Sequence, residues 1–568
     1  MPILSCQGEG KIVITAKGEV DDGRGGVRGT CACVDIPSTR TGRSHWYLRC
    51  SVAKHSGGER SVNVTDGTAD MNADGKSDES ILPITLTNKD SAELFAESGE
   101  ESGSTKRNVG QAALSRTQSR IEHKSRGLYG VREAARKDST LKFTALLHHV
   151  NEDCLTEAFL NLKKRSAVGV DEVTWHDYEQ NMEANIADLH GRIHRGAYRA
   201  LPTLRVWIPK PDGRQRPLGI TALEDKIVQK AVLWVLQSIY EQDFLGFSYG
   251  FRPGRSQHQA LDALSVAITS KKVKWILDAD VKGFFDAIDH SWLVKFLEHR
   301  IGDRRVLRLI RKWLHAGVLE EGQWSETTEG SPQGAVISPL LSNVYLHYVF
   351  DLWIEWWRKQ HCRQDVVVVR YADDFVVGFE SHSEATACLE ALRTRFAKFG
   401  LELHEGKTRL IEFGRYAIER RAKAGEGTPE TFDFLGFTHK CGKTRKHGRF
   451  TVQRHSISKR MRATLQKIKA NLQKRMHRPL GETARWLRRV IQGWLNYHAV
   501  PGNSNRIGRF VDEITRLWFH VIRRRSQRGR CWTWERMHRL VRKHLPRPRI
   551  IHPYPAHRFH ARLKVGAV

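Results

Sequence analysis

The sequence lacks the marks of secreted, disulfide-rich and membrane-spanning proteins. Its 568 residues include nine cysteines, which are scattered without the regular spacing of a disulfide framework. No stretch approaches the roughly 20 consecutive apolar residues that cross a bilayer. The first residues also lack a basic segment followed by an apolar run, which would indicate a secretory signal. These absences favour a cytoplasmic protein with reduced thiols and no membrane contact.

Acidic residues are scarce in the C-terminal part of the chain. Overall, 93 Lys and Arg stand against 63 Asp and Glu, a formal net charge of +30. Residues 451–500 contain twelve Lys/Arg and one Glu, and residues 520–568 contain fourteen and one. Tryptophans and tyrosines are interleaved with these cations. Because phosphates attract cations and unpaired bases stack on aromatic rings, this composition indicates an RNA-binding region.

Hydrophobic periodicity is missing from residues 1–105, which are rich in Gly, Ser, Thr and Asp. We expect a poorly ordered extension there. Helical patterns dominate residues 141–195, and RVWIPKPDGRQRPLGI, residues 205–220, reads as a basic β-hairpin with a Pro-Asp-Gly turn. Beyond residue 454 the pattern is again helical. The chain is therefore predicted to contain several units, only some of them mainly helical.

Two adjacent acids stand in the segment VVVVRYADDFVVGFE, residues 366–380. Asp373 and Asp374 separate two β-branched and aromatic runs that are typical of buried strands. Carboxylates held among such strands are costly unless a cation compensates them. A second apolar strand, around residues 276–281, supplies Asp280 at its end. Three carboxylates from two β elements predict an oxygen-rich site for Mg²⁺.

Such a site suits nucleotidyl transfer. Two divalent ions would activate an attacking hydroxyl and neutralise a leaving pyrophosphate. A polymerase also needs cations that hold a triphosphate, and the basic hairpin offers Lys210, Arg214 and Arg216.

These motifs resemble those of group II intron-encoded reverse transcriptases/maturases, and the likeness runs from about residue 105 to the C-terminus. The motifs occur in the family's order: YGFRPGRS (249–256), DVKGFFD (280–286), GSPQGAVISP (330–339), YADD (371–374), EGKTR (405–409), FLGF (434–437) and QGWLNY (492–497). The family commonly has a second glycine where Ala335 stands, and arginine where Gln492 stands.

The resemblance implies roles for individual residues. Asp280, Asp373 and Asp374 would be the catalytic acids, and together with the Val281 carbonyl they would hold two Mg²⁺ ions, with Mn²⁺ as a possible substitute. The residues that would bind the incoming dNTP are Lys210, Arg216, Phe285 and Gln333, with Phe285 as the steric gate against ribonucleotides.

Other residues would contact the primer, the template or intron RNA: Lys407, Leu435, Gly436, Trp494 and Tyr497. Trp494 and Tyr497 equally fit the core of a helical bundle, and Arg252 fits a structural or a substrate-binding role.

The implied fold is an α+β right-hand polymerase. Its fingers would consist of helices and a hairpin, its palm would be ferredoxin-like, and its α-helical thumb would continue into a maturase domain. We expect the N-terminal region and fingers over residues 106–275, the palm over 276–445, and the thumb and maturase domain with a basic tail over 446–568. The tail shows no cysteine pairs of a DNA endonuclease, so we expect that domain to be absent.

The implied function is RNA-directed DNA synthesis together with binding and splicing of a group II intron, in a bacterial cytoplasm. The partners would be intron RNA, a DNA target, a primer and dNTPs, and the oligomeric state stays open. Three alternatives remain: a domesticated reverse transcriptase in phage defence or CRISPR spacer acquisition, a splicing-only maturase, and a cellular RNA-dependent RNA polymerase.

Overall fold

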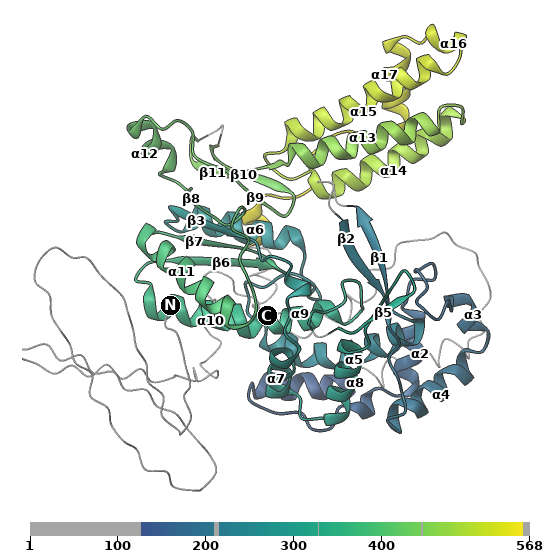
Figure 1. Cartoon of the computed structure of the whole chain (residues 1–568). Coiled ribbons are helices and arrows are strands. Elements are labelled where there is room, and N and C mark those ends of the chain that lie inside the picture. Colours follow the sequence, from purple (N-terminus) through teal and green to yellow (C-terminus); the bar gives the residue numbers. More distant parts are fainter. Residues whose placement is uncertain (1–126, 210–214, 328, 445–446, 560–568) are drawn as a thin grey trace, which may run out of the picture. The chain divides into compact units, whose positions relative to one another are not determined.

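The computed structural model describes residues 127–209, 215–327, 329–444 and 447–559 (Figure 1). All of them lie in the larger of the two units into which the chain divides, Ala69–Val568. The predicted N-terminal extension, residues 1–105, lies outside the described residues. So do Lys210 and Arg214 of the basic hairpin.

The part of the molecule around the predicted hairpin is built from helices and one small sheet, mostly from residues that precede the palm in the chain. The hairpin strands β1 and β2 are extended by two short strands into a sheet of order β2-β1-β4-β5. Side-chain caps begin some of the helices: Asn151 accepts a hydrogen bond from the backbone of Cys154, and Thr174 and Asp177 form a capping box. The elements are η1 (Leu147–His149), α2 (Glu152–Leu160), α3 (Trp175–Gln180), α4 (Met182–His194), β1 (Thr203–Pro209), β2 (Gln215–Ile220), α5 (Leu223–Asp243), α6 (Gln257–Ser270), β4 (Val318–Glu320) and β5 (Gln323–Ser325).

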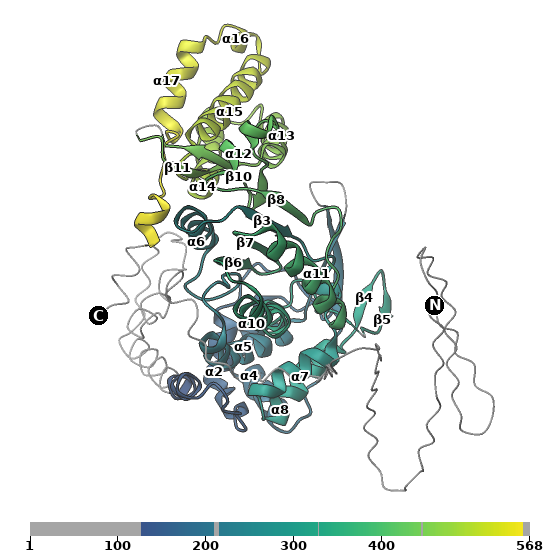
Figure 2. The same ribbon diagram turned by 90° about the vertical axis from the view of Figure 1, so that its left-hand side faces the viewer.

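The palm contains an antiparallel sheet of order β6-β7-β3-β8. Helices α10 and α11 lie along one face of this sheet (Figure 1, Figure 2), where Trp357 of α10 packs against Phe379 and α11 contacts β3 and β7. The central strands are buried because their side chains are almost entirely apolar. The elements are β3 (Trp275–Ala279), η2 (Phe284–Asp286), α7 (His290–Arg300), α8 (Arg304–Leu314), α9 (Ser338–Leu346), η3 (His347–Asp351), α10 (Leu352–His361), β6 (Val366–Tyr371), β7 (Asp374–Phe379), α11 (His382–Lys398), β8 (Arg409–Glu412) and α12 (Ala417–Ala424).

A three-stranded sheet of order β11-β10-β9 leads from the palm into the C-terminal helices. The boundary predicted at residues 445–446 falls between β10 and β11, which pair with each other in antiparallel fashion. The helices have a hydrophobic core of their own that includes Leu487, Ile514 and Trp518. The elements are β9 (Phe432–Phe434), β10 (Phe437–Lys443), β11 (Phe450–Ser456), α13 (Ser458–Lys474), α14 (Leu480–His498), α15 (Ser504–Arg524), α16 (Gln527–Arg530) and α17 (Trp534–His544).

The mixed helices and sheets confirm the predicted α+β class, with a helical C-terminal region. None of the helices described combines the length and the apolar character that crossing a membrane requires.

Candidate active site

Three predicted catalytic acids meet at one end of the palm sheet. Asp373 lies in the two-residue turn between β6 and β7, and Asp374 is the first residue of β7. Ala279, the last residue of β3, pairs with Phe375 of β7, so Asp280 follows directly beside Asp374. The hairpin and the register of β3 together gather the three carboxylates, as the strand pattern predicted.

The carboxylates crowd one another. Although Asp374 is exposed at the start of β7, the protein around its carboxylate and the charges of Asp373 and Asp280 raise the pKa of Asp374 to about 7. Burial and the charge of Asp280 also raise the pKa of Asp373. A fourth acid, Asp278 of β3, lies two residues before Asp280 in the chain. Burial raises the pKa of Asp278 to about 6. This excess of negative charge is what a divalent cation would relieve.

The three acids do not by themselves form a complete metal-binding site. Among the described residues, no three His, Cys, Asp or Glu side chains are grouped to hold a metal ion. The Nζ atom of Lys407 instead makes an ion pair with Oδ2 of Asp280. The donor set still fits a divalent metal ion, since carboxylate oxygens are ligands that such ions prefer and these carboxylates repel one another. A metal would have to compete with the Lys407 ammonium for Asp280.

A buried polar network holds the catalytic turn. The Arg370 guanidinium donates to both carboxylate oxygens of Asp351, at 2.7 and 2.5 Å, and to the carbonyl of Ala372 in the turn, at 3.0 Å. Asn343 accepts from Arg370 at 3.0 Å and donates to the Gly250 carbonyl at 2.7 Å. Burial alone would raise the pKa of Asp351, but the charges of Arg370 and His347 and their hydrogen bonds together outweigh it and lower that pKa. The network ties the turn to α9 and η3.

Gly250 lies directly against this turn. A Cβ atom there would be 2.2 Å from the backbone nitrogen of Ala372, much closer than real contacts allow. Ala372 itself has a φ of 56°, the left-handed conformation that tight turns need. Only glycine at position 250 permits the YGFRPGRS segment to support the YADD turn.

Arg252 of the same segment is a structural residue. It is 6% exposed, and its guanidinium donates to Glu241 and to the carbonyls of Leu245 and Ser248. Of the two roles that the sequence left open for Arg252, the geometry favours the structural one.

The GSPQGA loop is hydrogen-bonded both to the hairpin and to Phe285, which follows Asp280 in the chain. The charge of Arg216 offsets part of the rise in the pKa of Asp373, so this cation lies within electrostatic reach of the catalytic turn. The Gln333 carbonyl accepts from Gly219 of β2 at 2.6 Å, and the Ser331 backbone N–H donates to the Phe285 carbonyl at 2.7 Å. Phe285 is partly buried against the core. The loop therefore joins the hairpin to Phe285, one residue before the end of η2.

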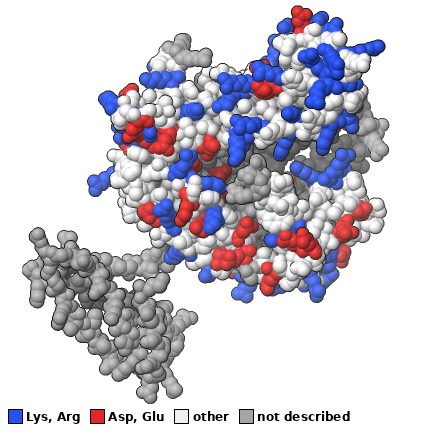
Figure 3. All heavy atoms as spheres, turned by 45° about the horizontal axis from the view of Figure 1, so that its top comes forward, with Lys and Arg blue, Asp and Glu red and all other residues white. Residues whose placement is uncertain are grey.

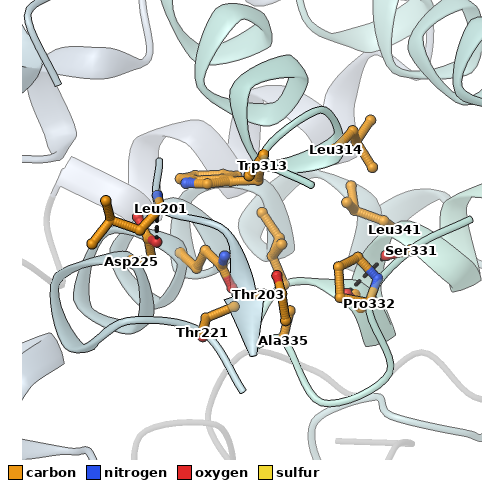
Figure 4. Close-up of a pocket in the computed structure, with 14 residues that line it drawn as sticks. Leu201, Thr203, Thr221, Asp225, Trp313, Leu314, Ser331, Pro332, Ala335 and Leu341 are labelled. Carbon is orange, nitrogen blue, oxygen red and sulfur yellow. Dashed lines mark hydrogen bonds between the residues drawn. The ribbon is translucent and has the colours of Figure 1, made fainter. Parts of the chain in front are cut away.

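A small cavity lies behind this loop (Figure 4). Its volume of about 10 Å³ has room for roughly one water molecule. Leu201 and Asp225 line one side, and Ser331 and Pro332 line the other. Asp225 hydrogen-bonds to Tyr198 and to the Leu201 backbone, and burial raises its pKa to about 6. A cavity of this size leaves no space for a nucleotide.

The residues predicted to hold the primer or RNA take part in packing. Leu435 and Gly436 form a turn with positive φ values of 46° and 80°. The Tyr497 hydroxyl donates to the Leu435 carbonyl at 2.7 Å. Trp494 stacks on Phe510, with ring centroids 3.8 Å apart. Tyr497 thus connects α14 to the turn, and Trp494 is partly buried against the core of the helical bundle; their contact with nucleic acid stays a prediction.

Lysines and arginines gather on the face of the helical region that Figure 3 shows. Residues 459–548 contain 24 Lys/Arg and four Asp/Glu. Arg485, Arg488 and Arg489 are exposed on α14, and they form no ion pair within the described ranges. This surface suits a polyanion.

Sequence reasoning missed the residues that support the catalytic turn, namely Arg370, Asp351 and Asn343. One signal was present: an arginine inside the apolar strand VVVVRY needs a buried partner. The sequence did not identify the partners of Arg370, because Asp351 and Asn343 come from helices earlier in the chain.

Comparisons with known proteins agree with this arrangement. The family "Reverse transcriptase (RNA-dependent DNA polymerase)" matches residues 208–439, and "Group II intron, maturase-specific domain" matches residues 459–548. Protein YkfC of Escherichia coli (strain K12) is 33% identical over 336 residues, which cover 51% of this chain and 87% of YkfC.

Two further relatives are intron proteins by their names. Group II intron-encoded protein LtrA of Lactococcus lactis subsp. cremoris is 36% identical over 207 residues, covering 36% of this chain and 34% of LtrA. The Uncharacterized 91 kDa protein in cob intron of Schizosaccharomyces pombe is 44% identical over 154 residues, covering 27% of this chain and 19% of that protein. The chain thus spans only about a third of LtrA, but most of YkfC. On its two domains and these relatives, the chain belongs to the group II intron-encoded reverse transcriptases/maturases, and it is an RNA-directed DNA polymerase joined to a maturase domain.

Proposed function

We propose that this protein extends a DNA primer along an RNA template at Asp280, Asp373 and Asp374, and that it binds the group II intron RNA that encodes it and promotes its splicing. The observation that carries the first part is the meeting of the three acids at one end of the palm sheet. The basic surface of α13–α17 supports the second.

Asp280, Asp373 and Asp374, with the Val281 carbonyl, would hold two Mg²⁺ ions. When bound, such ions lower the pKa of the primer hydroxyl and neutralise the charge on the leaving pyrophosphate. The protein's own part is to keep the acids rigid, and the Arg370 network holds the turn that carries Asp373. Mn²⁺ has the same preference for oxygen ligands and would substitute.

The dNTP would enter between the hairpin and the palm. Arg216 is the described hairpin cation with electrostatic reach to Asp373, so it would neutralise triphosphate charge there. Phe285, held by the Ser331 hydrogen bond to its carbonyl, would exclude a ribose 2′-hydroxyl, and Gln333 would contact the base pair. Lys210 would add a second cation from the same hairpin.

We place the protein in a bacterial cytoplasm. The described cysteines, Cys154, Cys362, Cys388, Cys441 and Cys531, are free thiols. Free thiols suit a reducing compartment. Intron RNA, target DNA and primer would all be available there.

Primer extension on an RNA template, with dNTPs and Mg²⁺, tests the polymerase site. Wild-type protein should extend the primer, and Asp373→Asn should abolish extension, because the turn loses a charged ligand. Asp365→Asn is the matched control: Asp365 precedes β6 at the opposite end of the same strand and pairs with Lys271. Equal extension by the wild type and Asp373→Asn would refute the assignment.

The same preparation separates the other candidate functions. RNA binding without DNA synthesis by the wild type would favour a splicing-only maturase, and preference for rNTPs over dNTPs would favour an RNA polymerase. The maturase-specific match over residues 459–548 disfavours a role confined to phage defence or spacer acquisition. Self-splicing of the flanking intron, accelerated by the protein, would establish its RNA substrate.

A further inference from the structure

Asp262, on α6, carries a buried carboxylate that the catalytic site does not use. The residue is 3% exposed. Arg454 of β11 donates to its Oδ1 atom at 2.8 Å, and the Nε atom of Arg558 lies 3.0 Å from its Oδ2 atom. One carboxylate therefore joins three segments that are far apart in the sequence. Without Arg558 the buried Oδ2 atom of Asp262 would lose its ion-pair partner, so the three segments are held together as a unit.

Arg558 belongs to a segment that we call the terminal strap, residues 549–559. The strap also binds the end of α14. The backbone N–H groups of Ile551 and His552 reach the Ala499 carbonyl at 3.0 and 3.2 Å, and His552 Nε2 lies 2.6 Å from the Asn496 carbonyl. The maturase-specific match ends at residue 548, so the strap lies beyond both family matches.

Aromatic packing continues from the strap toward the turn at Leu435 and Gly436. His552 lies against His258 of α6, with ring centroids 4.0 Å apart, and His258 lies 5.1 Å from Tyr497 of α14. The Tyr497 hydroxyl in turn donates to the Leu435 carbonyl. The strap, α6 and α14 thus share one packed junction, and that junction ends at a turn predicted to grip the primer.

We propose that the terminal strap positions α14 and the Leu435–Gly436 turn on the palm through Asp262, so that the primer–template is held during synthesis. This inference rests on the proposed polymerase function. The strap's residues act at a distance from the reacting atoms, so they are positioning residues. Their loss should weaken retention of the primer–template and spare the chemical step at the acids.

The test compares Arg558→Gln, Arg558→Lys and a chain ending at residue 548 with the wild type. Arg549→Gln is the matched control, because Arg549 is an exposed arginine of the same strap without an ion pair in the described residues. Each protein extends a primer on an RNA template in the presence of excess unlabelled primer–template as a trap. Product length, the affinity for primer–template, and kcat and KM for the first dNTP are measured.

We expect Arg558→Gln and the shortened chain to bind primer–template about tenfold more weakly, since a buried ion pair is lost. Their products should be shorter, while kcat and KM for the first dNTP stay close to the wild-type values. Arg558→Lys should restore part of the product length, and Arg549→Gln should behave as the wild type. Equal product lengths for Arg558→Gln and Arg549→Gln would overturn the proposal.

Hydrogen exchange gives a readout that does not depend on polymerase activity. In Arg558→Gln, the amides at the end of α14 and in residues 551–552 should exchange faster, and those of the palm sheet should not change. Unchanged exchange at the end of α14 would also overturn the proposal. A wild-type protein that makes no DNA would refute the polymerase function, and faster exchange in that case would still support the positioning of α14 by the strap.

Discussion

At the scale of single residues, the catalytic turn depends on a neighbour with no side chain. We predict that Gly250→Ala lowers primer extension by about 100-fold, because even a 1 Å displacement of catalytic groups has an effect of that size. The added methyl would overlap the Ala372 backbone and push the turn away from Asp280. The measurement is kcat/KM for a single dNTP, with circular dichroism to confirm that the variant folds.

Gly481→Ala is the control for this substitution. Gly481 lies in the first turn of α14, and a Cβ atom there would meet nothing within 4 Å. Alanine favours a helix over glycine by up to about 1 kcal/mol, so this variant should be at least as stable as the wild type. Full activity of Gly250→Ala would mean that the turn does not need its close support.

The crowded acids also predict a pH dependence of stability. The folded-state pKa of Asp374 is raised to about 7 from an ordinary value of 3.8. The folded protein therefore binds more protons than the unfolded chain between these values, and the contribution of Asp374 to stability falls as pH rises from about 4 to about 7. In a chelator, Asp374→Asn should melt at a higher temperature than the wild type at pH 8.

At pH 5 the difference in melting temperature should largely disappear, because the wild-type carboxyl is then protonated in the folded protein. Mg²⁺ should stabilise the wild type at pH 8 more than it stabilises Asp374→Asn, since a bound ligand favours the folded state. The melts require only purified protein, chelator and Mg²⁺. If the wild type is as stable as Asp374→Asn at pH 8 in the presence of a chelator, the raised pKa of Asp374 is contradicted.

At the scale of elements, α14 presents three exposed arginines on one surface. We predict that replacing Arg485, Arg488 and Arg489 with glutamine reduces the slope of log affinity for intron RNA against log salt by about 2 to 3, because each phosphate contact releases counterions. Filter binding at several salt concentrations measures the slope. Extension of a short primer should change much less.

The control variant replaces three exposed arginines outside the maturase-specific match. They belong to the start of α8: Arg304, Arg305 and Arg308. This variant loses the same formal charge as the α14 variant. A general electrostatic effect would therefore change the salt dependence of RNA affinity by the same amount in both variants. Equal slopes for the two triple variants would show that α14 is not the RNA-binding surface.

The strand pattern was enough to predict much of the palm. Apolar strands that end at Asp280 and flank Asp373–Asp374 imply that the acids meet, and in the structure they lie at one end of the sheet. The Arg370 network and the Asp262 junction were not predictable in the same way. Both depend on which distant segments pack together, and no local periodicity encodes that. The RNA contacts of Trp494 and Tyr497 remain predictions, because both residues serve packing.

At the scale of the whole molecule, the palm sheet and the C-terminal helices are built around separate hydrophobic cores. The C-terminal helices pack around Leu487, Ile514 and Trp518, apart from the core that contains the palm sheet. We predict that Asp373→Asn abolishes DNA synthesis and leaves protein-assisted splicing of the intron within about twofold of the wild type, since surface changes far from a site are usually near neutral. A splicing assay at low Mg²⁺ measures this, and a parallel loss of splicing would contradict it.

The support of the catalytic turn by Asn343, Asp351 and Gly250 has a consequence for refolding. These residues come from segments well before the turn in the sequence, so the active geometry depends on contacts of high sequence separation, which form slowly. Helices can form from local contacts first. During refolding, the recovery of helical signal should therefore precede the recovery of polymerase activity. The time at which polymerase activity recovers would then report when the long-range contacts of the catalytic turn form.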